Sequence, residues 1–217
     1  NASFNDVVFV MAYDKEYVNN VLRKHLDHGL DHSFIDKYVT WEVTLPEIDS
    51  QILRDKMKSY LEDHLFGLPD EEKERVLEGW GYVGNIIVEN LASVRHLKRY
   101  VNLTLPRYRK VYSKVDPADF FLLSLLQYRH LSIYNKLAHH VDMVRLDSKL
   151  DNLSKSDQDG WIQHMLGKLP PDVLLLIRNL FLDKPAGRGK ISDQRLIRSK
   201  DAFPYYFRYV KDKAEEK

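Results

Sequence analysis

The sequence has 217 residues, 44% of them hydrophobic and 30% charged, and its formal net charge is +1. This composition is typical of a globular protein of one large or two small domains, and a charge so near zero excludes a general attraction to nucleic acid or anionic membranes. The absence of cysteine excludes disulfides and cysteine-ligated zinc, and it fits a cytoplasmic location. The longest apolar runs, Val7–Ala12 and Val173–Ile177, fall far short of the roughly 20 residues of a membrane span.

The first 46 residues follow the order strand, helix, strand. Val7–Ala12 is apolar on both faces, as in a buried parallel strand, and Lys15–His28 has helical spacing that stops at Gly29. Tyr38–Leu45 alternates loosely and is closed by Pro46. This pattern predicts a short α/β unit. Both strands would have exposed edges, so we expect them to pair with each other or with another copy of the chain.

Two groups of polar residues in this part could carry chemistry. Asp14 follows the first predicted strand, where α/β sheets place their ligands, but aspartate is also a good N-cap for the helix that begins at Lys15. Both roles stay open. His25, His28 and His32 have near-helical spacing, but Gly29 interrupts the helix that would align them, so we expect no metal site.

From Asp49 onward the apolar spacing is helical. Helices are predicted from Asp49 to Gly67, from Glu71, from Ser93 with a kink at Pro106, from the N-cap Asp116, over Trp161–Leu166 and over Pro171–Phe181. Tyr82–Val88 has strand propensity, but its continuation favours a helix. Lys149–Asp159 and Lys184–Lys190 are predicted to be connecting segments, and the aromatic cluster Phe203–Val210 is predicted to pack on the helical body.

The most informative stretch is Ser93–Asn102. At 3.6 residues per turn it predicts an apolar stripe made of Val94, Leu97, Val101 and Leu105. A second face carries three cations and an amide, namely Arg95, Lys98, Arg99 and Asn102. Guanidinium and ammonium groups held on a helix suit a phosphate group, although a solvated basic surface would have the same residues.

The order of residues in this stretch resembles the signature of a known family. S-V-R-H-L-K-R-Y-V-N is similar to the Asn-Pro-Arg-x-x-Lys-Arg-Phe-x-Asn signature of the KAP family of P-loop NTPases, which belongs to the STAND and AAA-like ATPases. It departs from the signature at Ser93-Val94. F-V-M-A-Y-D-K-E-Y-V resembles the KAP segment after the Walker B motif, and F-I-D-K-Y-V-T-W-E-V-T-L-P resembles the strand that leads to Leu-Pro in that family. D-P-A-D-F-F-L-L-S-L-L-Q-Y resembles the leucine-rich helix after the signature.

The resemblance implies a mainly α chain, with a remnant of the P-loop α/β core over residues 1–46 and a helical lid over 47–217. In related ATPases a lid arginine, called sensor 2, contacts the terminal phosphates of the nucleotide. The resemblance gives this role to Arg95 or Arg99, with Lys98 on the same face. It places Asp14 near the sensor 1 position, which helps to orient the attacking water. Lys37 matches a family lysine, and the resemblance gives it no defined role.

The motifs that hold Mg-ATP are not found in the sequence. No G-x-x-x-x-G-K-[ST] occurs, and the nearest imitation, Gly187–Ile191, lacks the first glycine and the Ser/Thr. No apolar run ends in an acidic pair of the Walker B type. We therefore expect a C-terminal fragment of a KAP-type ATPase. ATP and Mg²⁺ would serve the parent protein, and the fragment alone would not hydrolyse ATP.

The expected partner is the N-terminal NTPase core, and the resemblance implies a bacterial membrane-associated or phage-defence system. Two other functions stay open. The chain could be a stand-alone helical module for protein interactions, or a helical domain that binds nucleic acid through the signature helix and Lys184–Lys190. The second is less expected, because the sequence shows no wider basic stripe.

Overall fold

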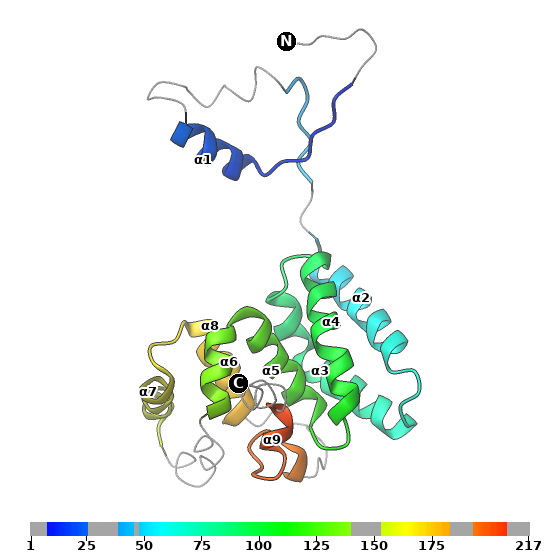
Figure 1. The fold of residues 1–217 in the computed structure, drawn as a ribbon, viewed down its shortest axis with the longest axis vertical. Coiled ribbons are helices and arrows are strands. Elements are labelled where there is room, and N and C mark those ends of the chain that lie inside the picture. Colours follow the sequence, from blue (N-terminus) through cyan, green and yellow to red (C-terminus); the bar gives the residue numbers. More distant parts are fainter. Residues whose placement is uncertain (1–7, 26–38, 46–47, 140–152, 183–192, 208–217) are drawn as a thin grey trace, which may run out of the picture. The chain divides into compact units, whose positions relative to one another are not determined.

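A computed structural model describes residues 8–25, 39–45, 48–139, 153–182 and 193–207 (Figure 1). The chain divides into two compact units, Asn1–Glu47 (unit 1) and Ile48–Lys217 (unit 2). All regular structure in the described parts is helical, which confirms the mainly α class.

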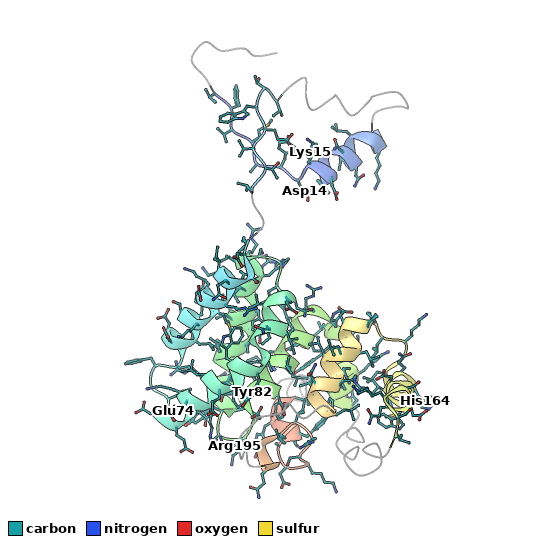
Figure 2. The ribbon with its side chains drawn as sticks, turned by 180° about the vertical axis from the view of Figure 1, so that it is seen from behind. Asp14, Lys15, Glu74, Tyr82, His164 and Arg195 are labelled. Carbon is teal, nitrogen blue, oxygen red and sulfur yellow. The ribbon has the colours of Figure 1, made fainter. Side chains whose placement is uncertain are left out.

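Unit 1 contains one helix, α1 (Lys15–His25). Asp14 begins it, because its carboxylate Oδ1 accepts a hydrogen bond from the Tyr17 N–H at 2.9 Å and its carbonyl accepts one from Val18. Figure 2 shows Asp14 and Lys15 together at this first turn. Lys15 also forms an ion pair of 2.7 Å with Glu42, which lies in the 39–45 segment. This exposed ion pair ties the helix to the segment.

The two predicted strands are not found among the described residues of unit 1. Residues 8–13 and 39–45 have no strand assignment, and their large apolar side chains face outward, with Val10 92% and Trp41 86% exposed. A strand persists when a neighbouring strand takes up its backbone hydrogen bonds and covers its side chains. Neither segment has such a neighbour within the described part of unit 1. The prediction of a remnant with two strands is therefore wrong for the described residues of unit 1, which contain α1 and no strand.

Unit 2 is a bundle of helices (Figure 1). Its elements are α2 (Ser50–His64), α3 (Asp70–Glu89), α4 (Val94–Val111), α5 (Pro117–Arg129), α6 (Leu131–His139), α7 (Lys155–Leu166), α8 (Pro171–Phe181), the 3₁₀ turn η3 (Asp193–Arg195) and α9 (Phe203–Tyr206). The side chains of Asp49, Ser93, Asp116 and Ser154 cap α2, α4, α5 and α7 by accepting first-turn N–H groups. The predicted helix starts at Asp49 and Asp116 and the predicted helix Pro171–Phe181 are confirmed.

The helix α5 lies at the centre of unit 2. Every residue from Pro117 to Leu126 is buried, and α5 packs against α3, α4, α6 and α8. It meets α3 closely at Gly79, where an added Cβ would lie 3.1 Å from the Ala118 nitrogen. The prediction that this leucine-rich helix is buried on most sides is confirmed.

Other local predictions had mixed outcomes. Tyr82–Val88 is helical within α3, as favoured. The expectation of a connecting segment up to Asp159 is wrong, because Ser154 caps a helix that already begins at Lys155. In the predicted cluster Phe203–Val210, the aromatic residues Phe203, Tyr205, Tyr206 and Phe207 pack on the helical core, and residues 208–210 lie outside the described part of the chain. Residues 184–190 lie outside the described part of the chain.

Candidate phosphate-binding face

The signature helix α4 is built as the apolar spacing predicts. Its N-cap is Ser93, whose hydroxyl accepts a hydrogen bond from the His96 N–H at 3.3 Å. Of the predicted stripe, Leu97, Val101 and Leu105 are buried, and Val94 is partly buried against the same core. The helix also buries Tyr100, Thr104, Tyr108 and Val111. Packing of this wide apolar side against its neighbours fixes which side of α4 faces outward.

The outward side carries the predicted cations. Arg95, Lys98, Arg99 and Asn102 are all exposed, and we call these four residues the basic face. None of the three cations forms an ion pair or hydrogen bond with another residue in the described parts of the chain. On α3, by contrast, Lys73 and Arg75 are paired with carboxylates of their own helix at 2.7 Å.

The helix end adds to the positive charge of this face. The first turn of α4 contains no acidic residue, whereas those of α3, α5, α7 and α8 each do. Free backbone N–H groups and the helix dipole make a helix N-terminus positive, and a carboxylate normally offsets this. Here Arg95 adds a cation instead. The beginning of α4 therefore favours an anion more strongly than the starts of α3, α5, α7 and α8 do.

The basic face lies at a defined end of unit 2. Figure 1 shows α2 and α4 beginning at the same end, which is where unit 2 starts at residue 48. The parallel arrangement agrees with the other end of α4, where the Arg109 guanidinium lies 3.6 Å from a Cβ added at Gly67, just after α2. Arg95 and Arg99 thus lie near the start of unit 2, and Arg109 lies far from it.

Asp14, the fourth predicted site residue, belongs to unit 1. It is exposed, and one of its carboxylate oxygens is engaged by the Tyr17 N–H. This geometry matches the capping role. The structure brings Arg95, Lys98 and Arg99 together on one helix face, whereas Asp14 is on a different element of a different unit.

The described residues contain no group of three or more His, Asp or Glu side chains placed to hold a metal ion. The side chains of His25, His28 and His32 are outside the described set. No helix in the described ranges has both the length and the apolar character needed to cross a membrane.

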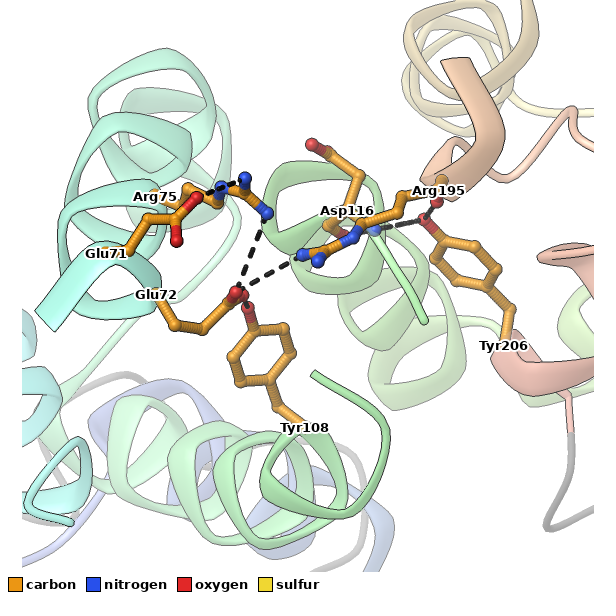
Figure 3. A network of polar contacts seen from close by, with 7 residues as sticks. All are labelled: Glu71, Glu72, Arg75, Tyr108, Asp116, Arg195 and Tyr206. Carbon is orange, nitrogen blue, oxygen red and sulfur yellow. Dashed lines mark hydrogen bonds and ion pairs between the residues drawn. The ribbon is translucent and has the colours of Figure 1, made fainter. Parts of the chain in front are cut away.

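A polar network around the buried Glu72 was not expected from the sequence (Figure 3). The Glu72 carboxylate accepts a hydrogen bond from the Tyr108 hydroxyl at 2.6 Å and forms ion pairs with Arg195 at 3.2 Å and Arg75 at 3.8 Å. Burial raises the pKa of Tyr108, and the neighbouring carboxylate raises it further. Tyr108 and Arg195 are 36 and 123 positions from Glu72, so no local sequence pattern joins them.

Comparison with known proteins supports the resemblance carried by residues 9–18, 34–46 and 93–102. The KAP family P-loop domain matches residues 2–111, just over half of the chain. The chain belongs to the KAP family. Comparisons with curated proteins and with solved structures gave no match. The KAP match takes in unit 1 and α2, α3 and α4, including the basic face, and α5 to α9 lie beyond it.

Proposed function

We propose that unit 2 is the helical lid of a KAP-type ATPase and that Arg95 or Arg99 contacts the terminal phosphates of the bound nucleotide. The observation that carries the proposal is the cluster of exposed cations at the start of α4, which pair with no other described residue and lie within the part of the chain that matches the KAP family. A guanidinium group can donate two parallel hydrogen bonds to a phosphate. A surface arginine that contacts only water makes no use of this capacity.

In this proposal the phosphate-binding loop and the Mg²⁺ ligands come from a P-loop core outside these 217 residues, because the sequence contains no G-x-x-x-x-G-K-[ST]. The chain alone is then unable to hydrolyse ATP. Bound ATP supplies the γ-phosphate that holds core and lid together, and its loss on hydrolysis releases the lid. Asp14 would lie on the core side. Its second carboxylate oxygen stays available for orienting water while the first caps α1.

The test uses the chain expressed together with its upstream coding sequence. We expect Arg95→Ala or Arg99→Ala to weaken Mg-ATP binding by about tenfold or more, the usual loss for a charge-assisted hydrogen bond, as measured by calorimetry. Arg109→Ala is the matched control, since it removes the same charge from the far end of the same helix.

Three results would contradict the proposal. The first is an upstream sequence without Walker motifs. The second is an equal loss of affinity in the Arg109 control, which would indicate only a general effect of charge. The third is salt-sensitive DNA binding by the chain that depends on Arg95 and Arg99, which would favour a nucleic-acid-binding domain.

A further inference from the structure

The segment 193–207, which we call the C-terminal strap, is part of the core of unit 2. It runs from η3 to α9, and most of its apolar side chains are buried, namely Leu196, Ile197, Ala202, Phe203, Tyr206 and Phe207. The Ile197 N–H donates a hydrogen bond of 3.0 Å to the buried Asp119 carboxylate on α5. The strap lies well beyond the region that matches the KAP family.

A chain of polar contacts leads from the strap to α4 (Figure 3). The Tyr206 hydroxyl accepts a hydrogen bond from the Asp116 N–H and donates one to the Arg195 carbonyl, both at 2.8 Å. These bonds hold the Arg195 backbone at the start of α5. The Arg195 guanidinium then reaches the Glu72 carboxylate, which accepts the Tyr108 hydroxyl of α4.

The contact at Glu72 has large energetic consequences, because its side chain is only 6% exposed. A carboxylate at such a site is costly unless cations and hydrogen-bond donors compensate it. Arg195 is the nearer of its two cations, and Arg75 lies at 3.8 Å. Loss of the strap would therefore leave the Glu72 carboxylate poorly paired. Because the same carboxylate accepts the hydrogen bond from Tyr108, the contact that holds Tyr108 would be disturbed as well.

The last turns of α4 depend on such side-chain contacts. Pro106 has no N–H, so the helical hydrogen bond to the Asn102 carbonyl cannot form. Tyr108 is two residues beyond this gap, on the inner side of the helix, and Arg99 is nine residues before it, about 14 Å along the axis. The Glu72 contact thus holds α4 just past its weakest point.

We propose that the C-terminal strap positions the basic face: Arg195 secures Glu72, Glu72 secures Tyr108, and Tyr108 holds α4 in the position in which Arg95 and Arg99 can contact a phosphate. This inference rests on the proposed function for its phosphate readout. Arg195, Glu72 and Tyr108 are positioning residues, which touch no nucleotide themselves.

The first experiment measures amide hydrogen exchange of α4 in the 217-residue chain. Arg195→Met should accelerate exchange in 94–111 by about tenfold or more, because it leaves a buried carboxylate without its nearer cation. Lys200→Met is the matched control, since it removes a cation from an exposed position of the same strap. Unchanged exchange in α4 with Arg195→Met, or equal acceleration in the control, overturns the proposal.

A double-mutant cycle tests the route through the tyrosine. Tyr108→Phe keeps the buried ring but removes the hydroxyl that reaches Glu72. If the strap acts on α4 through this hydroxyl, Arg195→Met should add little further acceleration in the Tyr108→Phe chain. Full additivity of the two changes overturns this route. If the Arg195→Met chain does not fold, the double variant Glu72→Gln Arg195→Met takes its place in the comparison. The glutamine removes the carboxylate charge that Arg195→Met would leave unpaired.

The second experiment measures Mg-ATP binding by the chain with its upstream sequence. Arg195→Met should weaken binding about threefold or more, and Lys200→Met should not. If Arg99→Ala has no effect, the proposed function is wrong, while hydrogen exchange still decides whether the strap holds α4. If Arg99→Ala weakens binding and Arg195→Met does not, the proposed function stands and the positioning role is overturned.

Discussion

Three buried tyrosines show how single residues join the helices of unit 2. The hydroxyl of Tyr100 donates to the Phe121 carbonyl of α5 at 2.9 Å, and that of Tyr108 donates to Glu72 of α3. Tyr134 of α6 accepts a hydrogen bond from Arg107 at 3.3 Å. Each ring fills the core while its hydroxyl bonds to a polar group on another helix. Burial, the largest cause in each case, raises the pKa of all three phenols.

These pKa shifts predict a loss of stability at alkaline pH. The unfolded phenols ionise near pH 10, whereas the folded ones keep their protons, so above pH 10 the native state binds more protons than the unfolded state. The free energy of unfolding should be unaffected by these groups below pH 10. It should fall above pH 10 by about 1.4 kcal/mol per pH unit for each tyrosine.

Urea unfolding between pH 9 and pH 11 measures this slope, and Tyr100→Phe is the informative variant. It keeps the buried ring and removes one titrating group, so the slope should become shallower by the share of one tyrosine. An identical slope in the two proteins would contradict burial of an un-ionised Tyr100 hydroxyl.

At the scale of elements, the contact of α3 with α5 decides how closely the core can pack. Gly79 lies on α3 where an added Cβ would meet the backbone nitrogen of Ala118 at 3.1 Å and the Pro117 side chain at 3.1 Å. Backbone atoms at the start of a buried helix cannot move aside without disturbing their own hydrogen bonds. Gly81, two residues further along α3, has open space around it. Both glycines are helical, but only at Gly79 does the absence of a side chain allow the close contact with α5.

This difference gives a paired prediction. Gly79→Ala should lower the free energy of unfolding by about 1–3 kcal/mol, because the added methyl group overpacks the contact with α5. Gly81→Ala should raise it by about 0.5–1 kcal/mol, since alanine is the better helix former. Thermal or urea unfolding of both variants checks the signs. Stabilisation by both substitutions would show that α3 can move away from α5 at little cost.

On the scale of the whole molecule, the region that matches the KAP family does not contain the centre of its own core. The match ends at residue 111, whereas α5, against which α3 and α4 pack, begins at Pro117. Buried residues of α8 and of the strap complete the same apolar cluster. Unit 2 is therefore one core, to which helices within and beyond the matched region both contribute.

A truncation tests this statement. Residues 48–111 alone should show no cooperative thermal unfolding by circular dichroism, whereas residues 48–217 should. Each large side chain of α5 contributes about 1.5–3 kcal/mol by its burial, so losing several of them exceeds the roughly 5–15 kcal/mol by which a domain is stable. A sharp transition in the shorter piece would mean that α2, α3 and α4 form a core of their own.

Local patterns in the amino-acid sequence determine most of the helical unit. Ser93 and Asp116 mark helix starts because a side-chain oxygen can accept a free N–H wherever the chain leads next. The stripe of Leu97, Val101 and Leu105 predicts the inner side of α4, and therefore its basic face, from periodicity alone. The family signature follows the same residues. These features depend on neighbours within about two turns of a helix, and the order of residues along the chain specifies such neighbours directly.

Tertiary structure decided the rest. The strand prediction in unit 1 failed because a strand depends on a partner, and an apolar run such as Val7–Ala12 does not specify one. The contact of Glu72 with Tyr108 and Arg195 could not be predicted from the sequence either. Only the packing of α3, α4 and the strap around α5 brings such distant positions together. Periodicity shows which side of a helix is buried, whereas the identity of what covers it is set by contacts between residues far apart in the chain.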